Sequence, residues 1–438
     1  MKKFRSVVAL LLSVLFVAAI FAGCDPAPVE STESTEDTTP KKVRVYGWND
    51  EFPGLVQKYV TLPEGYEWEF VINADADGLY QKVLDQDLAA GTQIDLLVAD
   101  VGYAQKYINN AQIATMEEIG VDVAALSANA NPYTIDISKK WDGGAVAAGT
   151  WQATPGQFVY RTDLAEQYLG VKTSEEMQAK VADWDKFMAT GKELYAASNG
   201  AMTLVPSLGD VWQVVQIERS TPWVQNNELK IDEKVNWWFN FAKEALASNV
   251  VGQKDPWGDA WTGSMGDGSV LGYFGCPWFI RFTLMPPAEA GGTSGKWNAI
   301  DGPQAYYWGG TYIMSAKTAK YPEIAKLVIE QMCIDTANMK KLALAEMEYV
   351  NNTVAIAEIM AEGNNANAFL GGQDYYKIFL EAGKKIDISA LSAYDTLIND
   401  AFNKAVSAYA KGELELAAAQ EQFKADITKG FPEITVVF

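Results

Sequence analysis

Histidine is absent from the 438 residues of the chain. Without an imidazole the protein cannot use Ser-His-Asp or Cys-His catalysis, and it cannot form a His-ligated zinc site or a helical H-E-x-x-H motif. The sequence also lacks a G-x-x-x-x-G-K loop and any G-x-G-x-x-G turn after a predicted strand. These absences exclude several common enzyme classes, and we predict neither a metal nor a cofactor.

Basic residues are few, because 35 Lys and Arg stand against 56 Asp and Glu and give a net charge of −21. A surface this acidic repels nucleic-acid phosphates and anionic lipid headgroups, so we expect no nucleic-acid partner. Calcium is left open around Asp75 and Asp77, although the sequence has no twelve-residue calcium loop there.

The chain is long for a single hydrophobic core, and its composition is that of a folded protein, with 49% hydrophobic and 21% charged residues. We therefore expect two lobes. Cysteine occurs only three times. Cys276 and Cys333 should lie in different lobes, where a disulfide would hinder movement, so we predict free, buried thiols. A bridge stays open as the alternative, since an oxidising compartment permits it.

Residues 1–23 have the layout of an export signal, with Lys2, Lys3 and Arg5 before an apolar run that is short for a spanning helix. The small residues before Cys24 are similar to the lipobox of bacterial lipoproteins, whose cysteine is acylated. An ordinary signal peptide with an incidental cysteine is the alternative. Segment 24–41 should be this lipidated cysteine and a disordered tether, which predicts an extracytoplasmic protein anchored to the bacterial cell membrane.

Alternating and continuous apolar runs predict strands at residues 43–47, 67–72 and 94–99, with a helix at 78–90 between the second and third. This β-α-β-α-β order predicts an α/β fold with parallel-rich mixed sheets flanked by helices. Farther along, residues 151–164 should cross between lobes into a strand and a helix. We expect a helix capped by Asp183, a strand and tight turn over 270–282, a Pro/Gly-rich loop over 285–298, a strand over 306–315, a helix from 321, and mostly helix beyond 340.

The first strand is followed by Trp48, Asn49, Asp50 and Glu51, where a helix should begin. Ligands of open α/β sheets bind beyond the carboxyl ends of the strands, so this segment predicts one lip of a polar and aromatic cleft. A solvated strand-helix turn with a half-buried Trp48 is the alternative. Other indoles and acids also follow predicted strands or turns, and a sugar needs this combination of flat apolar faces and carboxylate acceptors.

The order of these segments resembles the extracellular solute-binding proteins of bacterial ABC importers, family 1, the maltose-binding-protein-like sugar-binding class. The likeness rests on the lipobox and tether, residues 43–52, Y-R-T-D-L at 160–164, G-C-P-W at 275–278 and residues 309–324. The family pattern at 160–164 is Y-N-K-D-L, so Arg161 and Thr162 depart from it. Cys276 stands where the class often has a small residue.

The resemblance implies two α/β lobes joined by a hinge that closes on a mono- or oligosaccharide and delivers it to a permease, without catalysis and as a monomer. The expected lobes are residues 42–153 plus about 300–340, and 154–299 plus about 341–438. The ligand-binding residues carried over by position are Trp48, Asn49, Asp50, Asp75, Asp100, Asp210, Trp212, Trp278 and Trp308, with Trp257 and Trp261 as additions.

Three other functions remain open. An exported glycoside hydrolase would need two carboxylates roughly 5–9.5 Å apart, and Asp50, Glu51, Asp100 and Asp210 are candidates. A polyamine or another small polar solute would fit an acidic, Trp-lined cleft. Iron capture could use the doublets 306–307 and 375–376, but neighbouring tyrosines in a strand point to opposite faces.

Overall fold

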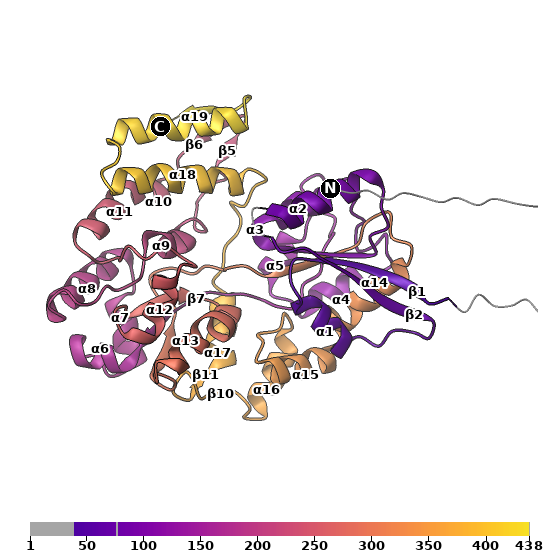
Figure 1. Cartoon of the computed structure of the whole chain (residues 1–438), viewed down its shortest axis with the longest axis horizontal. Coiled ribbons are helices and arrows are strands. Elements are labelled where there is room, and N and C mark those ends of the chain that lie inside the picture. Colours follow the sequence, from indigo (N-terminus) through magenta and orange to yellow (C-terminus); the bar gives the residue numbers. More distant parts are fainter. Residues whose placement is uncertain (1–38, 76–77, 438) are drawn as a thin grey trace, which may run out of the picture. The chain divides into compact units, whose positions relative to one another are not determined.

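A four-stranded sheet of order β2-β1-β3-β9 organises the first half of the fold (Figure 1). β1 (Lys41–Gly47), β2 (Tyr66–Ile72) and β3 (Leu96–Asp100) run parallel, whereas β9 (Thr311–Met314) pairs antiparallel with β3. The predicted parallel order of the first three strands is therefore confirmed. β3 is buried along most of its length, as its continuous apolar run predicts.

The computed structural model describes residues 39–75 and 78–437. The predicted export signal, the acylated Cys24 and the tether up to residue 38 lie outside the described residues, as does Asp77. The residues from Pro40 onward form one compact unit. In the described part of the chain, no helix has the length and apolar character needed to cross a bilayer.

Helices cover the four-stranded sheet, and we call this sheet with its helices the first lobe. The helix predicted after the second strand is α2 (Leu79–Ala90), and its Tyr80, Leu84 and Leu88 are buried at the predicted spacing. A helix also starts at Pro322 as predicted, because proline suits a first turn. The other helices of the first lobe are α1 (Glu51–Tyr59), α3 (Val101–Ile108), α4 (Val123–Ala128), α5 (Pro132–Ile137), α14 (Pro322–Ile329), η3 (Glu330–Ile334) and α15 (Thr336–Glu346). α16 (Thr353–Ala361) packs against α15 and α17 (Tyr375–Gly383).

A three-stranded antiparallel sheet of order β7-β4-β8 organises the second lobe. β4 (Gln157–Arg161), the strand predicted after the polar crossing, lies between β7 (Gly272–Gly275) and β8 (Trp297–Ile300). The helices of this lobe are α6 (Thr162–Leu169), α7 (Ser174–Lys180), α8 (Trp184–Ala197), α9 (Leu208–Val215), α10 (Glu233–Asn236), α11 (Trp238–Ala247), α12 (Asp259–Asp267), η2 (Phe279–Leu284), α13 (Met285–Ala290), α17 (Tyr375–Gly383), α18 (Asp395–Ala410) and α19 (Leu416–Gly430).

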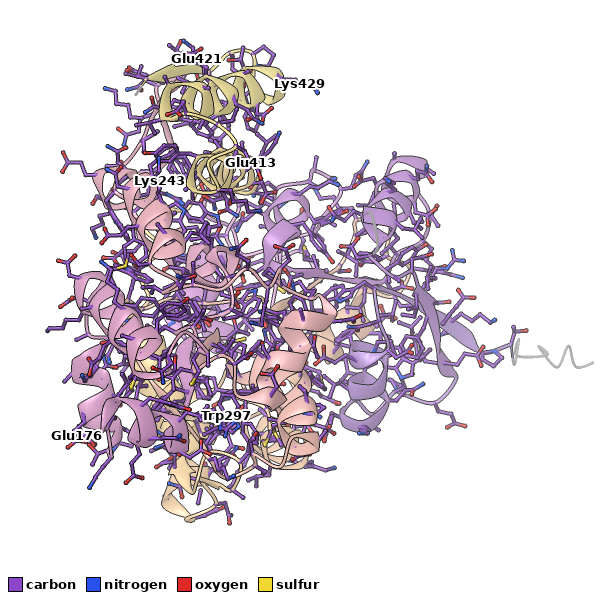
Figure 2. All side chains as sticks on the ribbon, turned by 60° about the vertical axis from the view of Figure 1, so that its left-hand side comes forward. Glu176, Lys243, Trp297, Glu413, Glu421 and Lys429 are labelled. Atoms are coloured by element: carbon purple, nitrogen blue, oxygen red, sulfur yellow. The ribbon has the colours of Figure 1, made fainter. Side chains whose placement is uncertain are left out.

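Short strands complete the second half of the chain. One small sheet has the order β12-β6-β5, and a separate hairpin joins β10 to β11. Their bounds are β5 (Val224–Gln225), β6 (Glu228–Lys230), β10 (Ala366–Asn367), β11 (Gln373–Asp374) and β12 (Thr435–Val437). Most of the chain beyond residue 340 is helical, as predicted. The charged side chains of Glu176, Lys243 and Glu421 lie on the outer faces of helices, and Glu413 is exposed in the turn between α18 and α19 (Figure 2).

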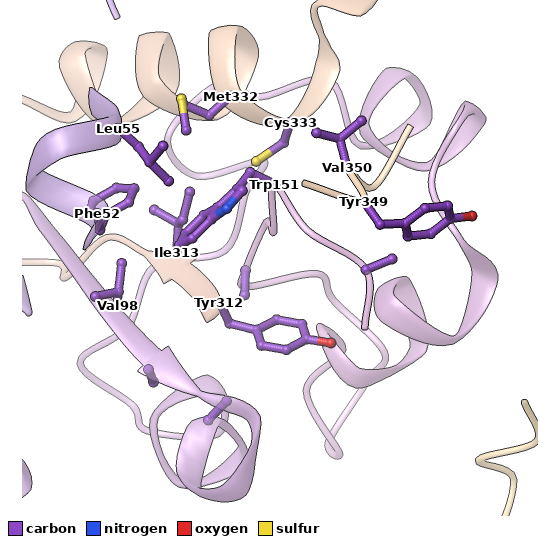
Figure 3. Packing of buried hydrophobic residues seen from close by; sticks show 14 of the residues in the cluster. Phe52, Leu55, Val98, Trp151, Tyr312, Ile313, Met332, Cys333, Tyr349 and Val350 are labelled. Carbon is purple, nitrogen blue, oxygen red and sulfur yellow. The ribbon is translucent and has the colours of Figure 1, made fainter. Parts of the chain in front are cut away.

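Three extended segments run side by side between the two sheets, and we call residues 149–156, 306–311 and 349–352 the crossing segments. They pair through isolated bridges between Gln152 and Val350 and between Pro155 and Tyr307. Trp151 in the first segment is fully buried and stacks on Phe52 of α1, with the ring centroids 5.5 Å apart (Figure 3). The first crossing segment is therefore packed into the first lobe and continues directly into β4 of the second.

The hydrophobic interior has two clusters that meet at the sheet of the second lobe. Successive residues of β4 face opposite sides, so Phe158 and Tyr160 join the cluster under α8, α9 and α11, while Val159 joins the other. That other cluster extends through the crossing segments to the four-stranded sheet. Cys276 and Cys333 both belong to it as free, buried thiols, as predicted.

Two local predictions are wrong. The segment 285–298, expected to be a Pro/Gly-rich loop, contains α13 and the start of β8. The two prolines after Met285 stand in the first turn of α13, where no backbone N–H is needed. Trp278, expected in a tight turn, immediately precedes the π-helix η2 with helical backbone angles. A rigid helical start therefore holds this indole.

Candidate ligand-binding site

Two neighbouring cavities meet at Asp100, the last residue of β3. The small cavity has a volume of about 320 Å³ and is lined by Trp48, Asn49, Glu51, Asp100, Gln152, Trp278, Phe282, Thr283, Gly310 and Thr311. The large cavity has a volume of about 950 Å³ and lies against α3 of the first lobe and α9 and α18 of the second, where it includes Tyr103, Tyr307 and Trp308. Both lobes contribute side chains to each cavity.

Asp100 lies at the end of β3, where it lines both cavities. It caps α3, and its Oδ1 accepts a hydrogen bond of 2.8 Å from the backbone N–H of Gly102. Burial raises the pKa of Asp100 to about 6, against the lowering effect of its backbone hydrogen bonds. The carboxylate is therefore short of solvent and of counter-charge, which makes it receptive to a hydrogen-bond donor from a ligand.

Trp48 brings a flat face from the first lobe. Its indole is half-buried and meets Tyr80 and Tyr103 edge to face, with centroids 5.9 and 6.2 Å away. Tyr80 is itself fixed, because its hydroxyl donates to the carbonyl oxygen of Val98 on β3 at 2.5 Å. The edge contacts hold the ring of Trp48 at the wall of the small cavity.

Three indoles from the second lobe and the neighbouring crossing segment form a group that we call the cavity tryptophans, namely Trp257, Trp278 and Trp308. The Nε1 of Trp278 donates to the carbonyl oxygen of Trp308 at 2.9 Å, and their rings lie 5.1 Å apart. Trp257 lies nearly parallel to Trp278, at 12° and 6.3 Å, and is 60% exposed. Trp278 thus lines the small cavity and Trp308 the large one, while Trp257 packs beside both without lining either cavity.

Gly309 permits this close arrangement. Its φ is +66°, and a Cβ at this position would stand 2.9 Å from the Nε1 of Trp278. Any other residue would strain the backbone or push the indole away. The two glycines at 309–310 therefore let the chain pass close to Trp278 where the two cavities adjoin.

Asp210 and Trp212 lie in α9, away from the lining of both cavities. Asp210 is buried, and its oxygens accept hydrogen bonds from the Ser207 hydroxyl at 2.5 Å and from the Nε1 of Trp261 at 3.0 Å. Trp261 in turn contacts Trp257, with centroids 5.2 Å apart. Asp210 thus supports the cavity tryptophans from behind, whereas Trp212 is buried against Trp238.

The remaining predicted residues have mixed positions. Asn49 lines the small cavity, and its Oδ1 accepts from the backbone N–H of Glu51 at 3.1 Å. Asp50 is exposed and lines neither cavity. Asp75 lies behind Gln81 of the large cavity, whose Nε2 reaches its Oδ2 at 3.4 Å.

Sequence reasoning missed several residues of the small cavity. Gln152 and Thr311 come from crossing segments, and the side-chain Nε2 of Gln152 donates to the Oγ1 of Thr311 at 3.0 Å. Phe282 and Thr283 follow Trp278 on η2 and appear as helix residues without a local signal. The polar composition of residues 151–154 was the one available indication for Gln152.

Three of the four tyrosines considered for iron donate hydrogen bonds to backbone carbonyl oxygens in the interior. The Tyr306 hydroxyl donates to the carbonyl oxygens of Gln157 and Gly275, at 3.0 and 3.1 Å. The hydroxyls of Tyr375 and Tyr376 donate to backbone carbonyls at 3.3 and 3.1 Å. Tyr306, Tyr375 and Tyr376 therefore have structural roles, whereas Tyr307 lines the large cavity.

No protein-family model matches the chain, and no curated protein sequence matches it. Solved structures do match. A protein described as an extracellular solute-binding protein of family 1 is 17% identical, with a TM-score of 0.75 over 89% of this chain and 99% of that one.

Two further solved structures carry bound disaccharides. An ABC transporter associated binding protein from B. animalis subsp. lactis, in complex with β-1,6-galactobiose, is 16% identical over 91% of this chain and all of that one, with a TM-score of 0.68. The galacto-N-biose-/lacto-N-biose I-binding protein from Bifidobacterium longum, in complex with lacto-N-biose, is 14% identical over 92% of this chain and all of that one, with a TM-score of 0.70. The chain therefore has the two-lobed α/β fold of these binding proteins, and the predicted fold class is confirmed.

Proposed function

We propose that the protein is an extracytoplasmic carbohydrate receptor that delivers a mono- or oligosaccharide to the permease of an ABC importer. The observation that carries this proposal is the small cavity, where Trp48 of the first lobe and Trp278 of the second line one space together with Asp100. Solved structures of the same fold include sugar-binding proteins of ABC transporters, which supports the same function.

The chemistry of the lining suits a sugar. Indole faces cover the C–H face of a pyranose ring, while carboxylate and amide oxygens accept hydrogen bonds from its hydroxyls. The large cavity adjoins the small one through Asp100, so a chain of more than one sugar unit has room to continue. A ligand that pairs these buried acceptors is favoured over one that leaves them unpaired, by about 1–3 kcal/mol for each group.

Capture follows from movement of the lobes about the crossing segments. We assign residues 42–153 plus about 300–348 to one lobe, and 154–299 plus about 353–438 to the other, which moves the boundary expected near residue 340 to the third crossing segment. The third crossing is set at 349–352, because α15 stays with the first lobe through the bond from Asn338 Nδ2 to the Tyr59 carbonyl oxygen at 2.9 Å. A sugar that touches Trp48 and Trp278 together gains contacts only when the lobes are close, so it favours the closed state.

The proposal includes a lipid anchor at Cys24, a monomeric receptor and no chemistry on the ligand. Glu51 and Asp100 are the carboxylates that a glycoside hydrolase would use here, since both line the small cavity. The solved structures of the same fold are binding proteins, which favours release of the sugar unchanged. Incubation of candidate oligosaccharides with the protein, followed by chromatography, distinguishes the two functions, because a hydrolase would shorten them.

Trp278→Ala tests the proposal directly. Loss of the indole face should weaken binding of the best ligand from a carbohydrate panel about 30-fold or more, near 2 kcal/mol, as measured by isothermal titration calorimetry. The matched control is Trp141→Ala, which removes a 44% exposed indole that lines neither cavity. Equal affinity of Trp278→Ala and the wild type would contradict the assignment, provided that circular dichroism shows both variants folded.

A further inference from the structure

The small cavity is lined by acids and by no base. Among the described residues that line it, Glu51 and Asp100 carry carboxylates, and none is Lys or Arg. The large cavity differs, because Lys106, Arg219 and Lys404 line it beside acids. The lining of the small cavity therefore carries negative charge without a basic residue of its own, unlike the lining of its neighbour.

Gln152 adds a buried acceptor to these carboxylates. Its side chain is 4% exposed, and its Nε2 donates a hydrogen bond of 3.0 Å to the Oγ1 of Thr311. The Oε1 is buried and receives no hydrogen bond from the described residues. A buried acceptor without a donor is costly, so a donor is missing from this part of the cavity.

Glu51 presents a second unpaired acceptor. In the described part of the chain no hydrogen-bond donor reaches its carboxylate, and burial raises the pKa of Glu51, while Arg281 lowers it and Glu346 raises it further. Arg281 is the nearby cation, but it is shared. Its guanidinium nitrogens lie 2.8 Å from Glu346 and 3.8 Å from Glu348. Glu51 is therefore left without a counter-charge of its own.

We propose that the small cavity binds the protonated amino group of an amine-bearing sugar, for which Glu51, Asp100 and the Oε1 of Gln152 are the acceptors in the lining. This inference rests on the proposed carbohydrate function and narrows it to a ligand class. An ammonium group supplies three donors and the missing positive charge, and the indole faces of Trp48 and Trp278 add cation–π attraction. A uronate would place a third carboxylate beside two others, so acidic sugars are rejected.

The test uses sugars that differ only in one substituent. Calorimetry at pH 7 compares free-amine, neutral, N-acetylated and uronate forms of the same β-1,4-linked disaccharide, in both the gluco and the galacto series. The free-amine form should bind about tenfold tighter than the matched neutral form, because one charge-assisted contact is gained in a desolvated site. The uronate should show no binding in either series.

Two variants locate the effect in the cavity. Glu51→Gln should reduce the amine preference, which is the ratio of the two affinities, from about tenfold to under about threefold, because the amide keeps an acceptor oxygen but loses the negative charge. The matched control is Glu64→Gln, because Glu64 is an exposed acid of the first lobe that lines neither cavity. This variant should keep the full preference, which separates local contact from net charge.

The outcomes separate the inference from the function on which it rests. Neutral or acidic sugars that bind as well as the amine overturn the inference and leave the carbohydrate function standing. An amine preference that survives in Glu51→Gln also overturns it, since the preference would then arise elsewhere. Failure of all sugars in the panel to bind overturns the proposed function itself.

Discussion

Two groups of tryptophans in the second half of the chain serve different purposes. Trp212, Trp223 and Trp238 are almost fully buried in the core of the second lobe, so we call them the core tryptophans. Trp212 and Trp223 pack on Phe402, and Trp238 stacks on Trp212. Among the cavity tryptophans, Trp278 and Trp308 each line a cavity, and Trp257 packs beside them with 60% of its surface exposed. Aromatic content alone therefore does not mark a binding site. What distinguishes the groups is whether a ring face is left for a ligand.

The largest expected effect is a loss of stability when one of the core tryptophans is removed. Trp238→Ala should lower the free energy of unfolding by about 3–5 kcal/mol, because it empties a fully buried site beside Trp212 and Phe241. Chemical denaturation measures this change, while calorimetry on the folded fraction should give the wild-type affinity. Trp238→Phe is the control and should cost far less, because the Nε1 it removes is buried without a partner among the described residues. A stable Trp238→Ala protein would mean that this group is not a core.

A second prediction concerns the acid that supports the cavity group. Burial raises the pKa of Asp210 to about 6, so the folded protein holds this proton more tightly than the unfolded chain does. The stabilisation from this proton is complete below the ordinary pKa of 3.8 and is lost as the pH rises through 6. Relative to wild type, Asp210→Asn should therefore gain about 2 kcal/mol of stability between pH 4 and pH 7.

Urea denaturation of both proteins at the two pH values measures the Asp210 effect, because other titrating groups cancel in the difference. Asp163→Asn is a suitable comparison. Burial raises the pKa of the half-exposed Asp163 carboxyl, but the hydrogen bond and the charge of Arg161 outweigh it, so the pKa of Asp163 is lowered. The relative stability of that variant should change little between pH 4 and pH 7, because a carboxyl with a lowered pKa has almost its whole favourable contact above its ordinary pKa of 3.8. A difference for Asp210→Asn that does not vary with pH would show that this carboxyl is not desolvated in solution.

The smallest expected effect concerns Trp257, which has a backbone φ of +68°. This left-handed conformation strains a bulky residue, so Trp257→Gly should raise the free energy of unfolding by about 1 kcal/mol. The same change should weaken sugar binding about fivefold, since it removes the ring that is nearly parallel to Trp278. Asn at this position is the control, because it tolerates the backbone without supplying a ring. A Trp257→Gly protein that is more stable but keeps its affinity would show that the ring of Trp257 does not contact the sugar.

Much of the first lobe could be predicted because its signals are local. The alternation in β1, the spacing of Tyr80, Leu84 and Leu88, and the continuous apolar run of β3 each determine an element within a few residues. The same signals lead to Trp48 and Asp100, because strand ends meet at one edge of a parallel sheet. These two residues line the small cavity as a consequence of that order.

The rest depends on long-range pairing, which leaves no local pattern. Gln152 reaches the cavity only because its segment pairs with Val350, about two hundred residues later in the chain. Asp210 is an acid of the kind that binds sugar hydroxyls, yet its hydrogen bonds from Ser207 and Trp261 keep it behind the cavity. Side-chain partners of this kind decide whether an acid faces a ligand or the interior.

The central claim is that Trp48 and Trp278 hold one sugar from opposite lobes. Calorimetric titration of the best ligand into the wild type, Trp48→Ala, Trp278→Ala and the double variant tests it most directly. We predict that each single variant loses about tenfold or more in affinity and that the double variant loses less than the product of the two, because the rings share one ligand and one closed state. Full affinity in both single variants, or losses that multiply as for independent sites, would contradict the account.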